Sequence, residues 1–142
     1  MKAYSVCDVM ISPIISVRWD VSVLEAAALL EEKNIHRLPV VDEENRLIGI
    51  LSKGDVREAL SIYNVTNPYA PDQDEILLAV DEMMSAPVHT VRPSDHLRQV
   101  VQLMLAHNIG GVPVVDEEDH PVGIITESDL FRLMLESWED LS

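Results

Sequence analysis

In both halves of the chain, hydrophobic residues follow first a helical spacing and then a strand spacing. After Ser22, a helix-start residue strengthened by Glu25 three positions on, apolar side chains recur at i, i+3, i+4 and i+7. These positions are Val23, Ala26, Ala27 and Leu30. The second half repeats them as Leu97, Val100, Val101 and Met104. Each half therefore predicts one amphipathic helix with this face against a core.

Short strands are predicted on both sides of that helix. In the first half, residues 14–17 predict a strand before the helix, and Pro39 leads a second strand at Val40–Val41. The polar turn 42–45 joins it to a returning arm at 47–51, which predicts a hairpin. A last helix follows Ser52 or Thr126. Its predicted inward residues are Val56, Ala59 and Leu60 in one half, and Leu130, Leu133 and Met134 in the other.

The two halves are copies of one unit at a constant offset. Residues 34–42 and 49–55 return as 108–116 and 123–129, which are 74 positions later without a gap. We therefore predict an α+β fold with the order β-α-β-β-α twice. The expected domains are repeat 1 at 4–60, a linker at 61–80 and repeat 2 at 81–136. The stretch 61–73 contains Asn and Pro and predicts a loop, and 74–80 is predicted to be helical.

Composition narrows the function classes. The chain has 142 residues, 47% of them hydrophobic, which is enough to bury a core. No apolar run approaches the roughly 20 residues of a membrane span, and the N-terminus lacks a signal-peptide pattern. Cys7 is the single cysteine, so no internal disulfide is expected. These features predict a cytoplasmic protein. A formal net charge of −15 argues against nucleic acid and anionic membrane as partners.

Catalytic signatures are absent from the sequence. It contains no GxSxG, no phosphate-binding Walker loop and no GxGxxG after a strand. Its five histidines lack the HExxH pattern and cysteine partners, so no zinc site is predicted. We expect no catalytic residue and no metal site, and we expect that the protein is not an enzyme.

The repeated sequence motifs resemble those of the CBS domain, the module named after cystathionine β-synthase. The matching motifs are Asp8–Pro13, Asn34–Asp42 and Gly49–Asp55, each with its second copy, and the resemblance covers about residues 4–136. The resemblance implies a tandem CBS pair with pseudo-twofold symmetry and two clefts between the repeats, and it leaves almost no room for another domain. It also implies that an adenosine-containing ligand binds in these clefts. The Ser/Thr-x-x-Asp words resemble the family's ribose–phosphate motif, at a helix N-terminus where amides and dipole suit phosphate.

The resemblance implies composite clefts. One cleft would combine Thr126 and Asp129 of repeat 2 with residues of repeat 1, namely Ile15, Ser16, His36 and Arg37. The other would combine Ser52 and Asp55 of repeat 1 with residues of repeat 2, namely His89, Thr90, Gly110 and Gly111. The first cleft holds a guanidinium, which binds phosphate in a bidentate way. It is therefore the predicted site of a phosphorylated adenosine. The alternative for the Ser/Thr-x-x-Asp words is helix capping, and for His36–Arg37 two solvated side chains.

The predicted function is a non-catalytic regulatory module that binds an AMP-, ADP- or ATP-like ligand and requires no cofactor. NAD and S-adenosylmethionine remain open as ligands, and the downstream partner is unknown. A homodimer is expected, because several helix residues leave apolar surface uncovered. They are Ala28, Leu29, Leu103, Phe131 and Leu135. One alternative is a structural interaction module with vacant clefts. Another is a Mg²⁺-responsive module that uses the acidic turns 42–44 and 116–119 with His120, although a solvated hairpin tip is the favoured interpretation of these turns.

Overall fold

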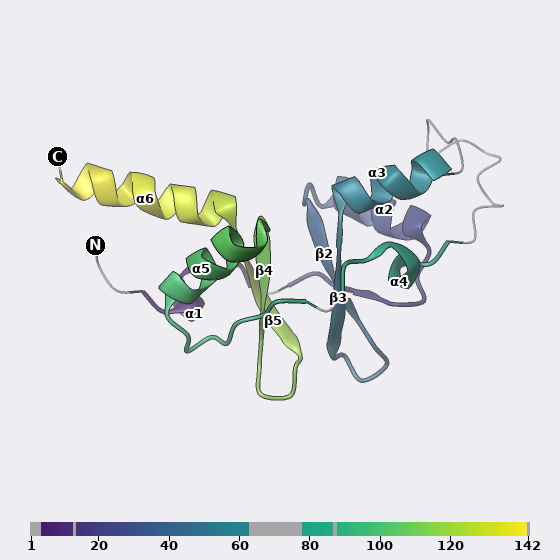
Figure 1. Cartoon of the computed structure of the whole chain (residues 1–142), viewed down its shortest axis with the longest axis horizontal. Helices are drawn as coiled ribbons and strands as arrows, with labels where there is room; N and C mark the ends of the chain where they lie inside the picture. The colour runs from purple at the N-terminus through teal and green to yellow at the C-terminus, as the bar shows by residue number, and fades with distance from the viewer. Residues whose placement is uncertain (1–3, 13, 63–77, 87, 142) are drawn as a thin grey trace. The chain divides into compact units, whose positions relative to one another are not determined.

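The computed structural model describes residues 4–12, 14–62, 78–86 and 88–141. The helices are α1 (Val6–Val9), α2 (Val23–Glu32), α3 (Lys53–Ile62), α4 (Val80–Met83), α5 (Leu97–His107) and α6 (Glu127–Leu141). The strands are β1 (Val17–Arg18), β2 (Arg37–Val41), β3 (Leu47–Ser52), β4 (Gly111–Val115) and β5 (Pro121–Thr126) (Figure 1). The predicted α+β class with two repeats is confirmed. None of the helices in the described ranges is long and apolar enough to cross a membrane.

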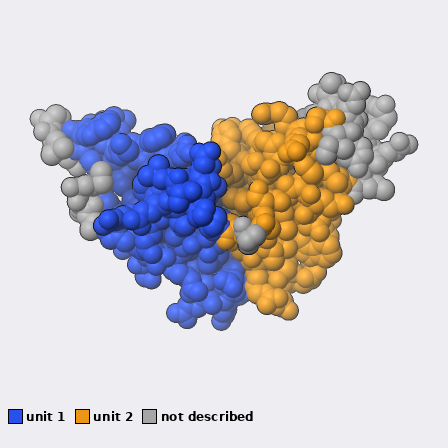
Figure 2. All heavy atoms as spheres, viewed as in Figure 1, with its two compact units in different colours: residues 1–14, 89–142 blue, residues 15–88 orange. Residues whose placement is uncertain are grey.

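The chain forms two compact units (Figure 2). Unit 1 contains residues 1–14 and 89–142, and unit 2 contains residues 15–88. The predicted repeats are defined by the similarity of their sequences, whereas the two units are defined by contacts between residues. The repeat boundaries and the pseudo-twofold symmetry therefore stay predictions.

Unit 2 is built on a three-stranded sheet. β1 runs parallel to β2, with Val17 opposite Val40, and β2 pairs antiparallel with β3. Helices α2 and α3 lie side by side beside this sheet (Figure 1). The core joins residues from both helices and from all three strands. Its buried members are Val17, Val23, Ala26, Leu30, Leu38, Val40, Leu51, Val56, Ala59 and Val80.

Unit 1 repeats this plan with a smaller sheet. β4 and β5 form a hairpin, and in the described part of the chain the first strand of the repeat is reduced to one parallel bridge between Val91 and Val114. The buried core of this unit consists of Val6, Val91, Leu97, Val100, Met104, Val112, Val114 and Ile125. The predicted face of α5 is confirmed except at Val101, which is 38% exposed. On α6, Met134 was expected to face inward but is 37% exposed.

Strand and helix limits differ from the predictions at several points. The first strand begins at Val17 rather than at residue 14, because only Val17 and Arg18 pair with β2. β2 begins at Arg37, ahead of Pro39, because Arg37 and Leu38 already pair with β3. Most of the predicted linker and of the predicted helix at 74–80 lies outside the described residues. α4 begins at Val80.

The start of each repeat packs on the sheet of the other repeat. We call residues 5–11 and 79–85 the leader segments. In unit 1, Ile11 bridges Ile124, and Val6 is fully buried in the core. In unit 2, Ser85 bridges Ile50, and Val80 is fully buried. Each core is therefore completed by the leader segment of the other repeat.

Candidate functional site at the N-termini of α3 and α6

The N-terminus of α3 is closed by a reciprocal cap. The Ser52 amide donates to Asp55 Oδ2 at 2.8 Å, and the Asp55 amide donates to Ser52 Oγ at 3.1 Å. The Lys53 amide donates to the carbonyl oxygen of His36 at 3.0 Å. Among the described residues, the Gly54 amide is the one N–H of this first turn that finds no acceptor. The capping interpretation of this motif is confirmed, and one amide remains for an anion.

The N-terminus of α6 uses the same motif differently. The Thr126 amide donates to Asp129 Oδ2 at 2.8 Å, and the Thr126 hydroxyl donates to the same oxygen at 3.1 Å. Helix capping by Ser or Thr predicts that the hydroxyl accepts from the amide three residues on, and this prediction is wrong for Thr126. The Glu127 amide donates to the carbonyl oxygen of Gly110 at 3.1 Å. Within the described part of the chain, the Ser128 and Asp129 amides find no acceptor, so α6 offers two donors.

Asp129 is a buried carboxylate held by fixed partners. It is 6% exposed, and its second oxygen, Oδ1, accepts from Arg132 Nη1 at 3.2 Å. A buried charge of this kind is tolerated because it is paired and hydrogen-bonded. Arg132 was missed in the sequence, although an Asp-x-x-Arg spacing on a helix places the two side chains on one face. The equivalent residue in repeat 1 is Glu58, so this cation belongs to α6 alone.

Basic side chains gather at the α3 end of unit 2. Arg37 lies opposite Ser52 in the β2–β3 register, which puts their side chains on the same face of the sheet. In the described structure, no side-chain partner is found for Arg37, His36 or Lys53. In unit 1 the matching positions hold Gly111, opposite Thr126, and Gly110. The structure thus brings His36 and Arg37 close to the motif of their own repeat.

The remaining predicted residues lie at the surface or near it. Ile15 is 37% exposed and Ser16 is half-buried, while His89 and Thr90 are exposed. The His89 ring stacks on His107, with centroids 3.7 Å apart and an interplanar angle of 16°. The two predicted clefts each combine residues of unit 1 with residues of unit 2. These pairings stay predictions.

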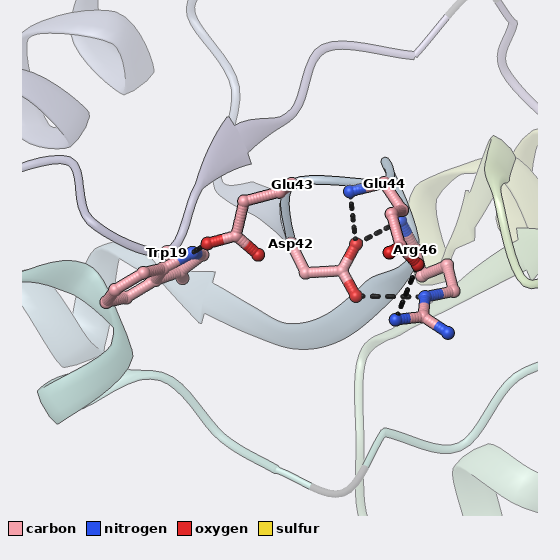
Figure 3. Close-up of polar contacts among 5 residues, drawn as sticks. All are labelled: Trp19, Asp42, Glu43, Glu44 and Arg46. Carbon is pink, nitrogen blue, oxygen red and sulfur yellow. Dashed lines mark hydrogen bonds and ion pairs between the residues drawn. The ribbon is translucent and has the colours of Figure 1, made fainter.

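The hairpin turns after β2 and β4 are built around one aspartate each. Asp42 Oδ1 accepts from the amides of Glu44 and Arg46, both at 2.9 Å (Figure 3). Asp116 Oδ1 accepts in the same way from the amides of Glu118 and His120, both at 2.9 Å.

These amides lower the pKa of both aspartates, with Arg46 making the largest contribution at Asp42 and His120 at Asp116. Beside the first turn, the backbone amide of Glu43 and the Trp19 indole N–H, at 2.7 Å, lower the pKa of Glu43. The acidic turns are thus ordered by their own hydrogen bonds.

Comparison with known proteins places this geometry in one family. A family model described as the CBS domain matches residues 6–62 and 80–136. A CBS domain-containing protein of Dictyostelium discoideum is 29% identical over 136 residues, covering 92% of this chain and 90% of that protein. The L-aspartate semialdehyde sulfurtransferase of Methanocaldococcus jannaschii is 34% identical over 126 residues. That match spans 89% of this chain but only 22% of the enzyme.

Solved structures of CBS pairs are similar over nearly the whole chain. The CBS domain pair of protein MJ0100, in complex with 5′-methylthioadenosine and S-adenosyl-L-methionine, is 32% identical with a TM-score of 0.82. The match covers 96% of this chain and 99% of that one. CBSX2 in complex with AMP is 26% identical with a TM-score of 0.76, covering 94% and 97% of the two chains. Since the family model matches both repeats, this chain belongs to the CBS domain family.

Proposed function

We propose that this protein is a non-catalytic regulatory module that binds an adenosine-containing ligand with residues of both repeats. The observation that carries the proposal is the N-terminus of α6, where two amides without an acceptor in the described structure lie beside the buried carboxylate of Asp129. Amides at a helix N-terminus suit a phosphate. A fixed carboxylate suits the hydroxyls of a ribose. Both groups occur in an adenosine phosphate.

The basic residues of unit 2 bear on which group is attached to the adenosine of the ligand, here called its tail. Two similar structures hold adenosine compounds, namely AMP in CBSX2, and 5′-methylthioadenosine and S-adenosyl-L-methionine in the MJ0100 pair. The shared part is adenosine. Here Arg37 and Lys53, with His36 next to Arg37 in the sequence, form a local basic region on a strongly acidic chain. We propose that this region selects a phosphorylated tail, because a guanidinium forms charge-assisted, bidentate bonds to phosphate.

Two assignments of the site compete. In the first, Thr126 and Asp129 act with Ile15, Ser16, His36 and Arg37. In the second, the ligand lies at Ser52 and Asp55, and His89, Thr90, Gly110 and Gly111 complete the site. Arg37 lies opposite Ser52, which favours a ligand at α3 with Arg37 added to the second assignment. The two open amides of α6 favour the first. We propose the first.

Calorimetric titration with adenosine, AMP, ADP, ATP and S-adenosylmethionine tests the proposal. We expect a phosphorylated compound to bind most tightly. Arg37→Ala should weaken it about tenfold or more, since a charge-assisted bond contributes roughly 1.5–3 kcal/mol. Adenosine binding should be unchanged in this variant. Lys33→Ala removes one exposed positive charge from the same unit and serves as the matched control.

The two aspartates distinguish the assignments. Asp129→Ala should weaken every ribose-bearing ligand, whereas Asp55→Ala should matter less. The opposite ranking would move the ligand to α3. If no compound in the panel binds or raises the melting temperature, the alternative of an interaction module with vacant clefts is favoured, because a ligand that binds only the native state must stabilise it.

A further inference from the structure

The two hairpin turns are copies of one another that differ at one informative position. Asp42 and Glu44 of the first turn correspond to Asp116 and Glu118 of the second. The fifth residue is Arg46 in the first turn and His120 in the second. Both turns hold their aspartate in the same way, through two backbone amides on Oδ1. In each turn Oδ2 of the aspartate is therefore directed at the fifth residue.

In the first turn a positive group lies between the two carboxylates. Arg46 Nε is 3.0 Å from Asp42 Oδ2, and Arg46 Nη2 is 2.7 Å from Glu44 Oε2 (Figure 3). This fold thus places a cation at the turn, with one oxygen of each carboxylate directed at it. The guanidinium carries the charge permanently.

In the second turn an imidazole replaces the cation. His120 Nδ1 is 3.3 Å from Asp116 Oδ2 and 3.6 Å from Glu118 Oε2, and all three ligand atoms lie within 4.8 Å of one another. Ligands about 2.0–2.2 Å from a tetrahedral zinc ion are about 3.3–3.6 Å apart. The two distances from His120 Nδ1 match edges of such a site, and the two carboxylate oxygens lie within 4.8 Å of each other, so the three atoms can converge on one ion. A neutral imidazole offers a lone pair there, and it leaves both carboxylate charges uncompensated.

We propose that Asp116, Glu118 and His120 bind one Zn²⁺ ion at the place that the Arg46 guanidinium occupies in the first turn. A set of one imidazole nitrogen and two carboxylate oxygens suits zinc better than Mg²⁺, which prefers oxygen ligands alone. The three side chains are 34–78% exposed, so the ion is reached directly from solvent and water supplies the fourth ligand. The site belongs to one turn of unit 1 and does not depend on the nucleotide.

Titration of the metal-free protein with ZnCl₂ against a chromophoric chelator tests the site. We expect one equivalent to bind, with MgCl₂ failing to compete at equal concentration. His120→Arg copies the first turn and should lower zinc affinity about tenfold or more, because even outer-shell changes cost about 10–100-fold. Circular dichroism should show the same fold in this variant. In the reverse variant, Arg46→His, we expect a second equivalent.

A charge-matched pair separates coordination from general attraction to an acidic surface. Glu118→Gln should weaken zinc binding about tenfold or more, as expected for loss of a ligand. Glu117→Gln removes the same charge from the same turn without touching the three ligands, and its affinity should stay within about twofold. The proposal is overturned if the wild-type protein binds no zinc, or if Glu117→Gln and Glu118→Gln weaken binding equally. It is also overturned if folded His120→Arg binds zinc as the wild type does.

Discussion

At the scale of single residues, two glycines are required by methionines of the leader segments. A Cβ atom at Gly49 would overlap the Met84 sulfur, and one at Gly123 would lie 2.7 Å from the Met10 sulfur and 3.1 Å from the Ile11 carbonyl oxygen. Neither glycine has a positive φ. The requirement is therefore for space, not for backbone conformation.

Alanine at either glycine should destabilise the protein. We expect Gly49→Ala and Gly123→Ala each to lower the free energy of unfolding by about 1–3 kcal/mol, the usual cost of overpacking a closely packed contact. Urea denaturation measures this change. The matched control is Gly54→Ala in the first turn of α3, where the nearest neighbour of a new Cβ would be Ser52 Oγ at 3.5 Å. That variant should be neutral or more stable by up to about 1 kcal/mol. Equal losses at all three positions would refute the packing argument.

Single residues could be predicted where a local sequence motif determines the contact. A Ser or Thr three positions before an Asp at a helix start predicts a cap, and both copies form one. The sequence does not reveal the direction of the hydrogen bond made by the hydroxyl. The Ser52 hydroxyl accepts and the Thr126 hydroxyl donates, although both residues stand at the same position of the motif. Arg132 was missed because the Ser/Thr-x-x-Asp motif ends at the aspartate and carries no signal for the residue three positions on.

At the scale of elements, α6 carries an apolar stripe that unit 1 does not cover. Phe131, Leu135 and Trp138 recur at i, i+4 and i+7 and are 63%, 55% and 61% exposed. A stripe of this kind on a 15-residue helix is typical of a surface that packs against another molecule. The homodimer expected from Phe131, Leu135 and other uncovered helix residues stays a prediction, and we propose that this stripe, which also includes Trp138, forms its contact.

Charge placed in the stripe should dissociate the dimer. We expect the wild-type protein to sediment as a dimer and Leu135→Glu to sediment as a monomer, because an unpaired carboxylate in an apolar interface is costly. Glu136→Lys changes a charge on the same helix outside the stripe and should remain dimeric. A wild-type protein that is monomeric across the whole concentration series, with and without nucleotide, would rule out this contact.

The helix faces were largely predictable, and the exceptions have a local reason. Leu97, Val100 and Met104 are buried as the helical period requires, whereas Val101 lies at the edge of the face. The same edge position in α2 is Ala27, which is small enough to stay half-buried. Periodicity gives the centre of a helix face, but the width that a small sheet can cover depends on packing partners far away in the sequence.

At the scale of the whole molecule, the leader segments connect each core to the other repeat. A matched pair of variants tests this connection. Val6→Ala and Val80→Ala each truncate a fully buried side chain, and we expect each to cost about 1–3 kcal/mol. Hydrogen exchange should then quicken in β4 and β5 for Val6→Ala, and in β2 and β3 for Val80→Ala. Quickening in the strands of the variant's own repeat would contradict the exchanged packing.

The exchange of leader segments could not be predicted from the repeats themselves. Met10 and Met84 occupy equivalent positions in similar sequence motifs, and so do Gly49 and Gly123. A leader that packs on its own repeat would therefore make the same kinds of contacts as a leader that packs on the other. The sequence predicts two similar units, but only long-range packing decides which leader completes which core.

The leader exchange also bears on how such a chain can arise. A polypeptide with a single repeat would carry a leader without a sheet to receive it, and a sheet without a leader. Two identical copies would satisfy both needs by reciprocal donation, which is the logic of a domain-swapped homodimer. Joining two such copies end to end would preserve every contact and would raise the effective concentration of each partner. Gene duplication with fusion thus turns an association between separate molecules into a permanent intramolecular one.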